Sequence, residues 1–89
     1  MTTHRSHPDI IKRLKRAEGH LKSIVTMLEA DRSCLDIAQQ LQAVEKAISN
    51  AKKTLVHDHL EHCLDHALRD GSGDPGDAIR EFKEITKYL

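Results

Sequence analysis

Apolar residues recur every three or four positions along two long segments of the chain. The first stripe alternates steps of four and three residues and consists of Ile10, Leu14, Ala17, Leu21, Ile24 and Leu28. The second keeps a similar rhythm at Leu41, Val44, Ile48, Ala51 and Leu55. Such heptad-like spacing predicts amphipathic helices that pack side by side. No segment shows the apolar–polar alternation of a strand. The pattern therefore predicts an all-α fold.

Polar and helix-breaking residues mark the ends of three helices. Ser6 can cap the first helix, and Pro8 suits its first turn, where a missing N–H does no harm. Ser33, with Asp36 three residues later, resembles the capping box of a second helix. We expect a single helical domain over 1–89. Its expected elements are helices over about 7–30, 34–69 and 77–88 and a linker over 70–76 rich in Gly, Asp and Pro.

The middle helix is too long for a compact monomer of 89 residues. At 1.5 Å per residue, a helix over 34–69 is about 54 Å long. The chain has one Phe, one Tyr and no Trp, so its core must consist of aliphatic side chains. A chain this poor in large apolar groups buries little surface alone. We therefore predict that the long helix lies against a partner chain in a homo-oligomer.

The formal net charge is zero, but the charges are unevenly distributed. Residues 1–33 carry seven Lys or Arg against four Asp or Glu, whereas residues 61–89 carry four against seven. Basic residues crowd in the first helix, among them Lys12, Arg13 and Arg16. This asymmetry fits a polyanion partner at one end of the molecule, and it also fits a solvated helix face.

The chain has no apolar run near the length needed to span a membrane. Its first residues lack the apolar region of a secretory signal. We therefore expect a cytoplasmic protein with no membrane partner. In that reducing compartment the two cysteines are expected to be thiols.

Two candidate metal ligands lie four residues apart on the middle helix. His59 and Cys63 project from one face and can share an ion. Imidazole and thiolate suit transition metals, although the pair alone is as often structural as metal-binding. Cys34 lies about 44 Å from Cys63 along one straight helix. It can complete the chelate only if the helix breaks or if two chains run antiparallel. In an antiparallel pair, Cys34 of one chain meets His59 and Cys63 of the other.

Further histidines accompany these ligands. His57, His62 and His66 can extend the site or remain at the surface, and His4 can reach it from the N-terminal tail. No phosphate-binding loop, nucleophile elbow or His-Glu-x-x-His helix is present, so we expect neither an enzyme nor a small-molecule substrate. A helix-turn-helix signature is also absent.

Four segments of this chain resemble the CsoR/RcnR family of bacterial metal- and thiol-responsive repressors. They are Arg16-Ala-Glu-Gly19, Met27, Cys34-Leu-Asp-Ile-Ala-Gln39-Gln40-Leu-Gln-Ala43-Val44 and His59-Leu-Glu-His-Cys63. The resemblance covers nearly the whole chain, and the order of these motifs is specific. It implies a dimer with an antiparallel four-helix core, usually paired into a tetramer. It also implies a ligand site across the dimer interface and repression that is relieved when a metal or an electrophile binds.

The resemblance implies that Cys34, His59 and Cys63 match the ligand set of the copper(I) sensors. The nickel and cobalt sensors add an N-terminal nitrogen ligand, and His4 stands where such a histidine is expected. Copper sensors often carry Tyr just before the first Cys, where this chain has Ser33. We therefore expect nickel(II) or cobalt(II) ahead of copper(I), with zinc(II) as a further candidate.

The resemblance also implies DNA binding through basic surfaces of the first two helices. Arg13 and Arg16 match basic family positions, whereas a basic position of the second helix is Glu45 here, with Lys46 beside it. The expected contacts to operator DNA are Lys12, Arg13, Arg16, Lys46, Lys52 and Lys53. Because phosphate contacts release counterions, such binding should weaken with salt.

Two other functions fit the same residues. One is a repressor that senses a thiol or electrophile through Cys34. Formaldehyde sensors, however, carry Pro where this chain has Thr2, and persulfide sensors lack the histidine found here at His59. The other is a metal-storage or metal-chaperone bundle that does not bind DNA. The preferred interpretation is a metal-sensing repressor of an efflux or detoxification operon.

Overall fold

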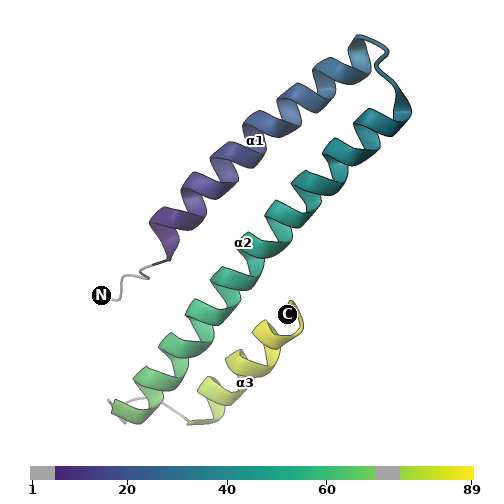
Figure 1. Cartoon of the computed structure of the whole chain (residues 1–89). Coiled ribbons are helices and arrows are strands. Elements are labelled where there is room, and N and C mark those ends of the chain that lie inside the picture. The colour runs from purple at the N-terminus through teal and green to yellow at the C-terminus, as the bar shows by residue number, and fades with distance from the viewer. Residues whose placement is uncertain (1–5, 70–74) are drawn as a thin grey trace.

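The computed structural model describes residues 6–69 and 75–89, without the side chains of Cys63, 66–69, Pro75 and Ala78. The described residues form three helices and no strand: α1 (His7–Glu29), α2 (Cys34–Arg69) and α3 (Pro75–Thr86). α1 and α2 run antiparallel, and α3 turns back beside the last part of α2 (Figure 1). The predicted all-α class is confirmed, and α3 begins two residues before its expected start.

Residues spaced seven positions apart on each helix form the interface between α1 and α2. The buried residues of this interface are Ile10, Ala17 and Ile24 on α1 and Ile37, Val44 and Ala51 on α2. Ile24, Ile37 and Val44 form one cluster, against which Met27 packs. A spacing of seven residues keeps these side chains on one line of each helix, because two turns take about seven residues.

The intervening apolar positions remain exposed in the single chain. Leu14, Leu21 and Leu28 on α1 and Leu41, Ile48 and Leu55 on α2 are between 38% and 56% exposed. About half of the apolar residues in the two predicted stripes are therefore not covered by the other helix of the same chain. A surface with this many large apolar side chains is typical of an interface with another chain.

A short turn joins the two long helices. Asp31 adopts a left-handed conformation with φ of 54°, which Asp tolerates better than most residues. The amide of Arg32 then donates to the carbonyl oxygen of Met27 over 3.0 Å. Ser33 caps the next helix, because its Oγ accepts a 3.1 Å hydrogen bond from the amide of Asp36. The predicted cap of α2 is confirmed.

Replacing Ser33 by Ala is expected to lower the free energy of unfolding by about 1 kcal/mol, because the Asp36 amide loses its acceptor. Urea unfolding followed by circular dichroism measures the change. The matched control is Ser23→Ala, since the exposed Ser23 hydroxyl donates to the carbonyl oxygen of Gly19 within α1. An equal decrease in the free energy of unfolding in both variants would contradict the role of Ser33 as a cap.

α1 begins at His7 as expected, with Pro8 in its first turn, but the predicted cap hydrogen bond of Ser6 is not formed. Ser6 occupies the N-cap position but makes no side-chain cap hydrogen bond. Its hydroxyl instead donates to Oδ2 of Asp58 on α2, 2.5 Å away. The serine was predicted to satisfy its own helix, but it ties the beginning of α1 to α2 one residue before His59. A partner 52 positions away cannot be seen in local sequence.

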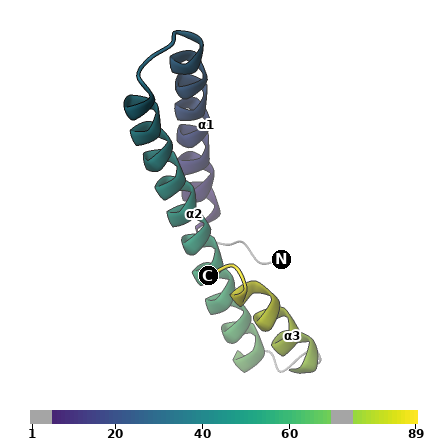
Figure 2. The same ribbon diagram turned by 90° about the vertical axis from the view of Figure 1, so that its right-hand side faces the viewer.

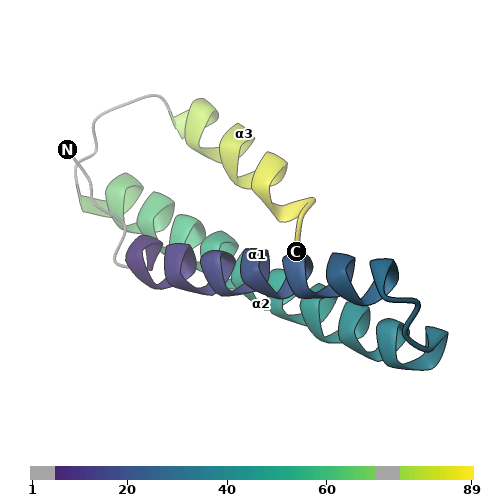
Figure 3. The ribbon, with the colours of Figure 1, turned by 90° about the horizontal axis from the view of Figure 1, so that it is seen from above.

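The single chain is elongated rather than compact. It measures 58 × 23 × 13 Å, and its radius of gyration is 18.0 Å, whereas a compact domain of this length has a value of about 12 Å. α1 and α3 each contact α2 and, among the described residues, not each other. The views in Figures 2 and 3 show α3 to one side of the α1–α2 hairpin. None of the helices, over the part of the chain described, is long and apolar enough to cross a membrane.

Candidate functional site

The predicted metal ligands lie on one line of α2 together with the exposed apolar residues. The line runs at steps of seven and then four residues through Cys34, Leu41, Ile48, Leu55, His59 and Cys63. Such steps keep residues on one helix face. This line, here called the α2 stripe, is separate from the Ile37–Val44–Ala51 line that α1 covers. The side of α2 that bears the candidate ligands is therefore the side left open by α1.

Cys34 occupies the first turn of α2 and is exposed. His59 lies on the same helix, about 38 Å away at 1.5 Å per residue. Among the described side chains no group of three or more His, Cys, Asp or Glu can hold an ion within one chain. Cys34 and His59 therefore lie far apart in a single copy. This separation agrees with the prediction made from the length of α2.

Glu81 on α3 holds the imidazole of His59. Nε2 of His59 and Oε1 of Glu81 lie 3.0 Å apart, and the His59 side chain is only 23% exposed. Val56, three residues before His59, is almost fully buried at 1% exposure. Packing and a carboxylate partner thus fix the ring in place. Metal-bound histidines commonly donate their second ring N–H to a carboxylate in this way, which orients the ring for the metal.

The side chains of two predicted ligands lie outside the described part of the structure. The backbone of Cys63 is one turn beyond His59 in α2, but its side chain is not described. His4 precedes the first described residue, Ser6, by two positions. The side chain of His66 is likewise outside the described set, whereas His57 is exposed and His62 half-buried on α2.

The predicted DNA-binding residues are all exposed, on both helices of the hairpin. Lys12, Arg13 and Arg16 lie on one side of α1, and Nε of Arg13 is 2.8 Å from Oδ2 of Asp9. On α2, Lys46 and Lys53 flank Asn50 at spacings of four and three residues, so the three share a surface.

Lys52 lies elsewhere on α2. It follows Ile48 by four residues and is therefore on the side of the α2 stripe. The six predicted basic residues consequently do not form one surface in the single chain.

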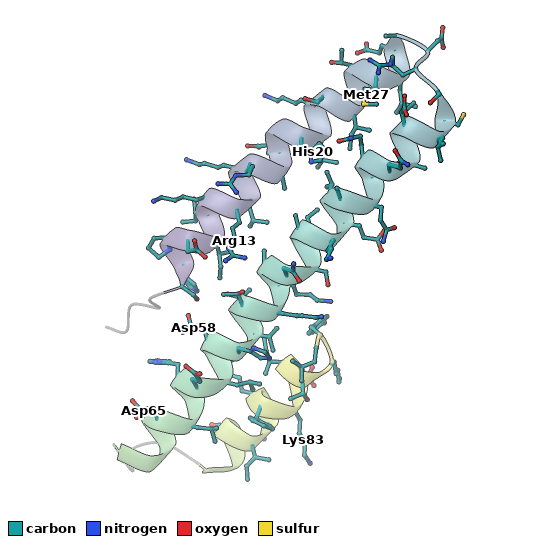
Figure 4. The ribbon with its side chains drawn as sticks, viewed as in Figure 1. Arg13, His20, Met27, Asp58, Asp65 and Lys83 are labelled. Carbon is teal, nitrogen blue, oxygen red and sulfur yellow. The ribbon has the colours of Figure 1, made fainter. Side chains whose placement is uncertain are left out.

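A second polar link joins the two helices near the basic residues. Nε2 of His20 on α1 and Oε1 of Gln40 on α2 are 2.6 Å apart. Figure 4 shows Arg13 and His20 on the part of α1 that faces α2, with Asp58 further along α2. Gln40 belongs to the Gln-Gln motif, whereas His20 was not among the predicted site residues. Its position one turn after Arg16 was the available signal.

Glu81, Asp9 and Asn50 were also missed. Asp9 is recognisable as a partner of Arg13 because the two are four residues apart on a helix. Asn50 and Glu81 become visible only when α2 is placed beside α1 and α3.

The sequence of this chain is similar to those of known metal-responsive repressors. The profile of a family described as "Metal-sensitive transcriptional repressor" matches residues 6–88. The chain is 41% identical over 78 residues to the copper-sensing transcriptional repressor CsoR of Mycobacterium ulcerans (strain Agy99), covering 88% of this chain and 65% of that protein. It is 40% identical over 80 residues to CsoR of Bacillus subtilis (strain 168), covering 88% and 79%. The chain thus spans slightly less than two thirds of the mycobacterial relative.

Two solved structures share the fold. The nickel-responsive transcriptional regulator InrS superposes with a TM-score of 0.83 at 27% identity, over 100% of this chain and 99% of that one. The copper-sensing repressor CsoR with Cu(I) from Geobacillus thermodenitrificans NG80-2 superposes with a TM-score of 0.80 at 34% identity, over 98% and 88%. Both relatives are metal-responsive regulators, and they respond to different metals.

Proposed function

This chain belongs to the family of metal-sensitive transcriptional repressors, and from that premise we propose a specific mechanism. Two copies pair through the α2 stripe, and the dimer, or a tetramer of two dimers, binds operator DNA through α1 and α2. A transition metal then binds between Cys34 of one copy and His59 and Cys63 of the other. This binding releases the DNA and allows an efflux or detoxification operon to be expressed. The family's members are transcriptional repressors, not enzymes.

The continuity of the α2 stripe is the observation that carries this proposal. Cys34 lies at one end of the stripe and the His59–Cys63 pair at the other, with exposed Leu41, Ile48 and Leu55 between them. A two-fold axis that makes two such stripes antiparallel places each end beside the opposite end of its partner. The same packing that covers the apolar residues therefore assembles the ligands, so metal binding depends on how the two chains lie together.

The residues present fit a transition metal. Two thiolates and one imidazole are soft and borderline ligands that suit copper(I), nickel(II), cobalt(II) and zinc(II). The Glu81 carboxylate at Nε2 would orient the His59 ring for a bound ion. A bound ion supplies coordinate bonds that join the two chains and requires deprotonated thiols. Cys34, His59 and Cys63 bind the ion, and Glu81 orients the ring.

The choice of metal depends on a fourth ligand. Three ligands satisfy copper(I), whereas square-planar nickel(II) needs a further nitrogen. His4 is the proposed donor, and the Ser6–Asp58 hydrogen bond supports this assignment because it anchors the chain two residues from His4 and one residue from His59. We place nickel(II) or cobalt(II) first on this ground and copper(I) next. Absorption spectra with each metal, compared between wild type and His4→Ala, distinguish them.

Fluorescence anisotropy with DNA from upstream of the protein's own gene tests the whole proposal. The metal-free protein is expected to bind this DNA, and the cognate metal is expected to weaken binding by about 5- to 150-fold, as for an allosteric coupling of 1–3 kcal/mol. Cys34→Ala is expected to bind the DNA equally well and to ignore the metal. Binding that no candidate metal changes would contradict metal sensing.

The exposure of Cys34 supports one alternative, a repressor that senses an electrophile or persulfide. An exposed thiol is accessible to such reagents. Mass spectrometry of protein treated with persulfide or aldehyde, alongside anisotropy of the same sample, tests this function. DNA release that follows the mass increase at Cys34, with no response to metals, would establish it.

A further inference from the structure

An open hollow lies between α1 and α2 on the basic part of the hairpin. Its polar lining is Asp9, Lys12, Arg13, Arg16, His20 and Asn50, and the floor includes Ala17 and Ala47. The small alanine side chains leave the space, and longer polar side chains surround it. Five of the six polar residues come from α1, and Asn50 comes from α2.

The hollow has an excess of positive charge. Three of its side chains are always cationic near neutral pH, and one, Asp9, is anionic. Asp9 forms an exposed ion pair with Arg13, the two side chains being 56% and 48% exposed. Guanidinium groups recognise phosphate through paired N–H donors, and an amide such as Asn50 supplies further N–H donors. The chemistry of the lining therefore suits a phosphate group.

Pairing of two copies leaves the hollow open. Successive residues on a helix are rotated by about 100°, so Asn50 lies about 160° around α2 from Ile48 on the α2 stripe. On α1, Arg13 is about 100° from the exposed Leu14. A partner that covers Leu14 and Ile48 therefore approaches from another direction. The hollow remains available to a second ligand while the proposed dimer is formed.

We propose that this hollow binds one backbone phosphate of the DNA through Arg13, Arg16 and Asn50, and that Asp9 competes with that phosphate for Arg13. This inference rests on the proposed function and adds residues to it. Asn50 and Asp9 were not among the predicted DNA contacts. His20 is a positioning residue, because its 2.6 Å contact with Gln40 joins the two helices that form the walls. A phosphate contact positions the protein on the duplex without reading its sequence.

The competition predicts that removing a native carboxylate tightens DNA binding. Asp9→Asn releases Arg13 from its ion pair, and an exposed pair of this kind is worth about 0.2–1 kcal/mol, so affinity should rise about 1.4- to five-fold for each copy in contact with DNA. The matched control is Glu18→Gln, which removes the same charge from an exposed position halfway around α1 and about 14 Å along it. Anisotropy titrations at several salt concentrations measure both variants.

A second variant tests separately whether Asn50, the polar residue that α2 contributes to the hollow, contacts the phosphate. Asn50→Asp places a carboxylate beside the phosphate and is expected to weaken binding about five-fold or more. Gln42→Glu makes the same charge change about 12 Å away along α2, beyond the screening length of physiological salt. Circular dichroism confirms that each variant is folded.

The outcomes separate this inference from the proposed function. The hollow is supported as a phosphate site if the wild-type protein binds DNA and two differences are found. Asp9→Asn must bind DNA more tightly than Glu18→Gln, and Asn50→Asp must bind it more weakly than Gln42→Glu. Wild-type binding with no difference within either pair of variants overturns the phosphate site and leaves the repressor function intact. Wild-type protein that does not bind DNA overturns both.

Discussion

A dimer that combines one Cys34→Ala chain with one His59→Ala chain is expected to bind one metal ion with wild-type affinity, although neither variant does so alone. In the proposed assembly each site takes Cys34 from one chain and His59 with Cys63 from the other. One site of the mixed dimer lacks both Cys34 and His59, and the second site is complete. Loss of an outer-shell partner already weakens metal binding about 10- to 100-fold, so loss of a ligand should weaken each homodimer by about 100-fold or more.

The experiment requires two affinity tags, so that only mixed dimers are isolated after co-expression. Metal is titrated against a chromophoric chelator, and the stoichiometry is read from the end point. A matched control pairs Cys34→Ala with a Cys34→Ala, His59→Ala double variant, in which both sites lack Cys34. If the mixed dimer bound no better than this control, the ligands would not be shared between chains, and the proposed mechanism would be wrong.

Helix positions and one helix end followed from sequence because they depend on nearby residues. The seven-residue spacing of Ile10, Ala17 and Ile24 places them on one face, and Ser33 caps α2 through a residue three positions away. The sequence predicted which apolar residues share a helix face. It did not predict which of them are buried between α1 and α2 and which stay exposed. Which alternate positions α1 covers depends on how the two helices are rotated against each other, and spacing alone does not determine that rotation.

The candidate site was only partly predictable for the same reason. Cys34 and His59 were identified by residue type and spacing, but the Glu81 partner of His59 depends on where α3 lies against α2. The Ser6–Asp58 and His20–Gln40 contacts join residues 52 and 20 positions apart. Long-range polar contacts of this kind follow from the packing of helices, so they become available only with the structure.

Ile48→Asp is expected to abolish pairing of the chain. The midpoint between Cys34 and the His59–Cys63 pair falls at residues 47–48, so an antiparallel dimer that joins these ligands has its two-fold axis next to Ile48. The variant then places two carboxylates against each other in an apolar interface. Burial of an unpaired charge costs several kcal/mol, and a loss of about 4 kcal/mol weakens association about a thousand-fold.

Light scattering after size-exclusion chromatography measures the mass, and circular dichroism measures helicity over the same concentrations. We expect Ile48→Asp to elute with the mass of one chain or to lose helicity, since Leu41 and Leu55 then remain exposed to water as in the single chain. Gln42→Asp is the control, because it adds the same charge to an exposed position on α2 away from the stripe. Retention of the wild-type mass and helicity by Ile48→Asp would show that the α2 stripe is not the interface. The shared metal site would then lose its physical basis, since no other arrangement of two straight α2 helices brings Cys34 within reach of a partner's His59 while covering the apolar residues between them.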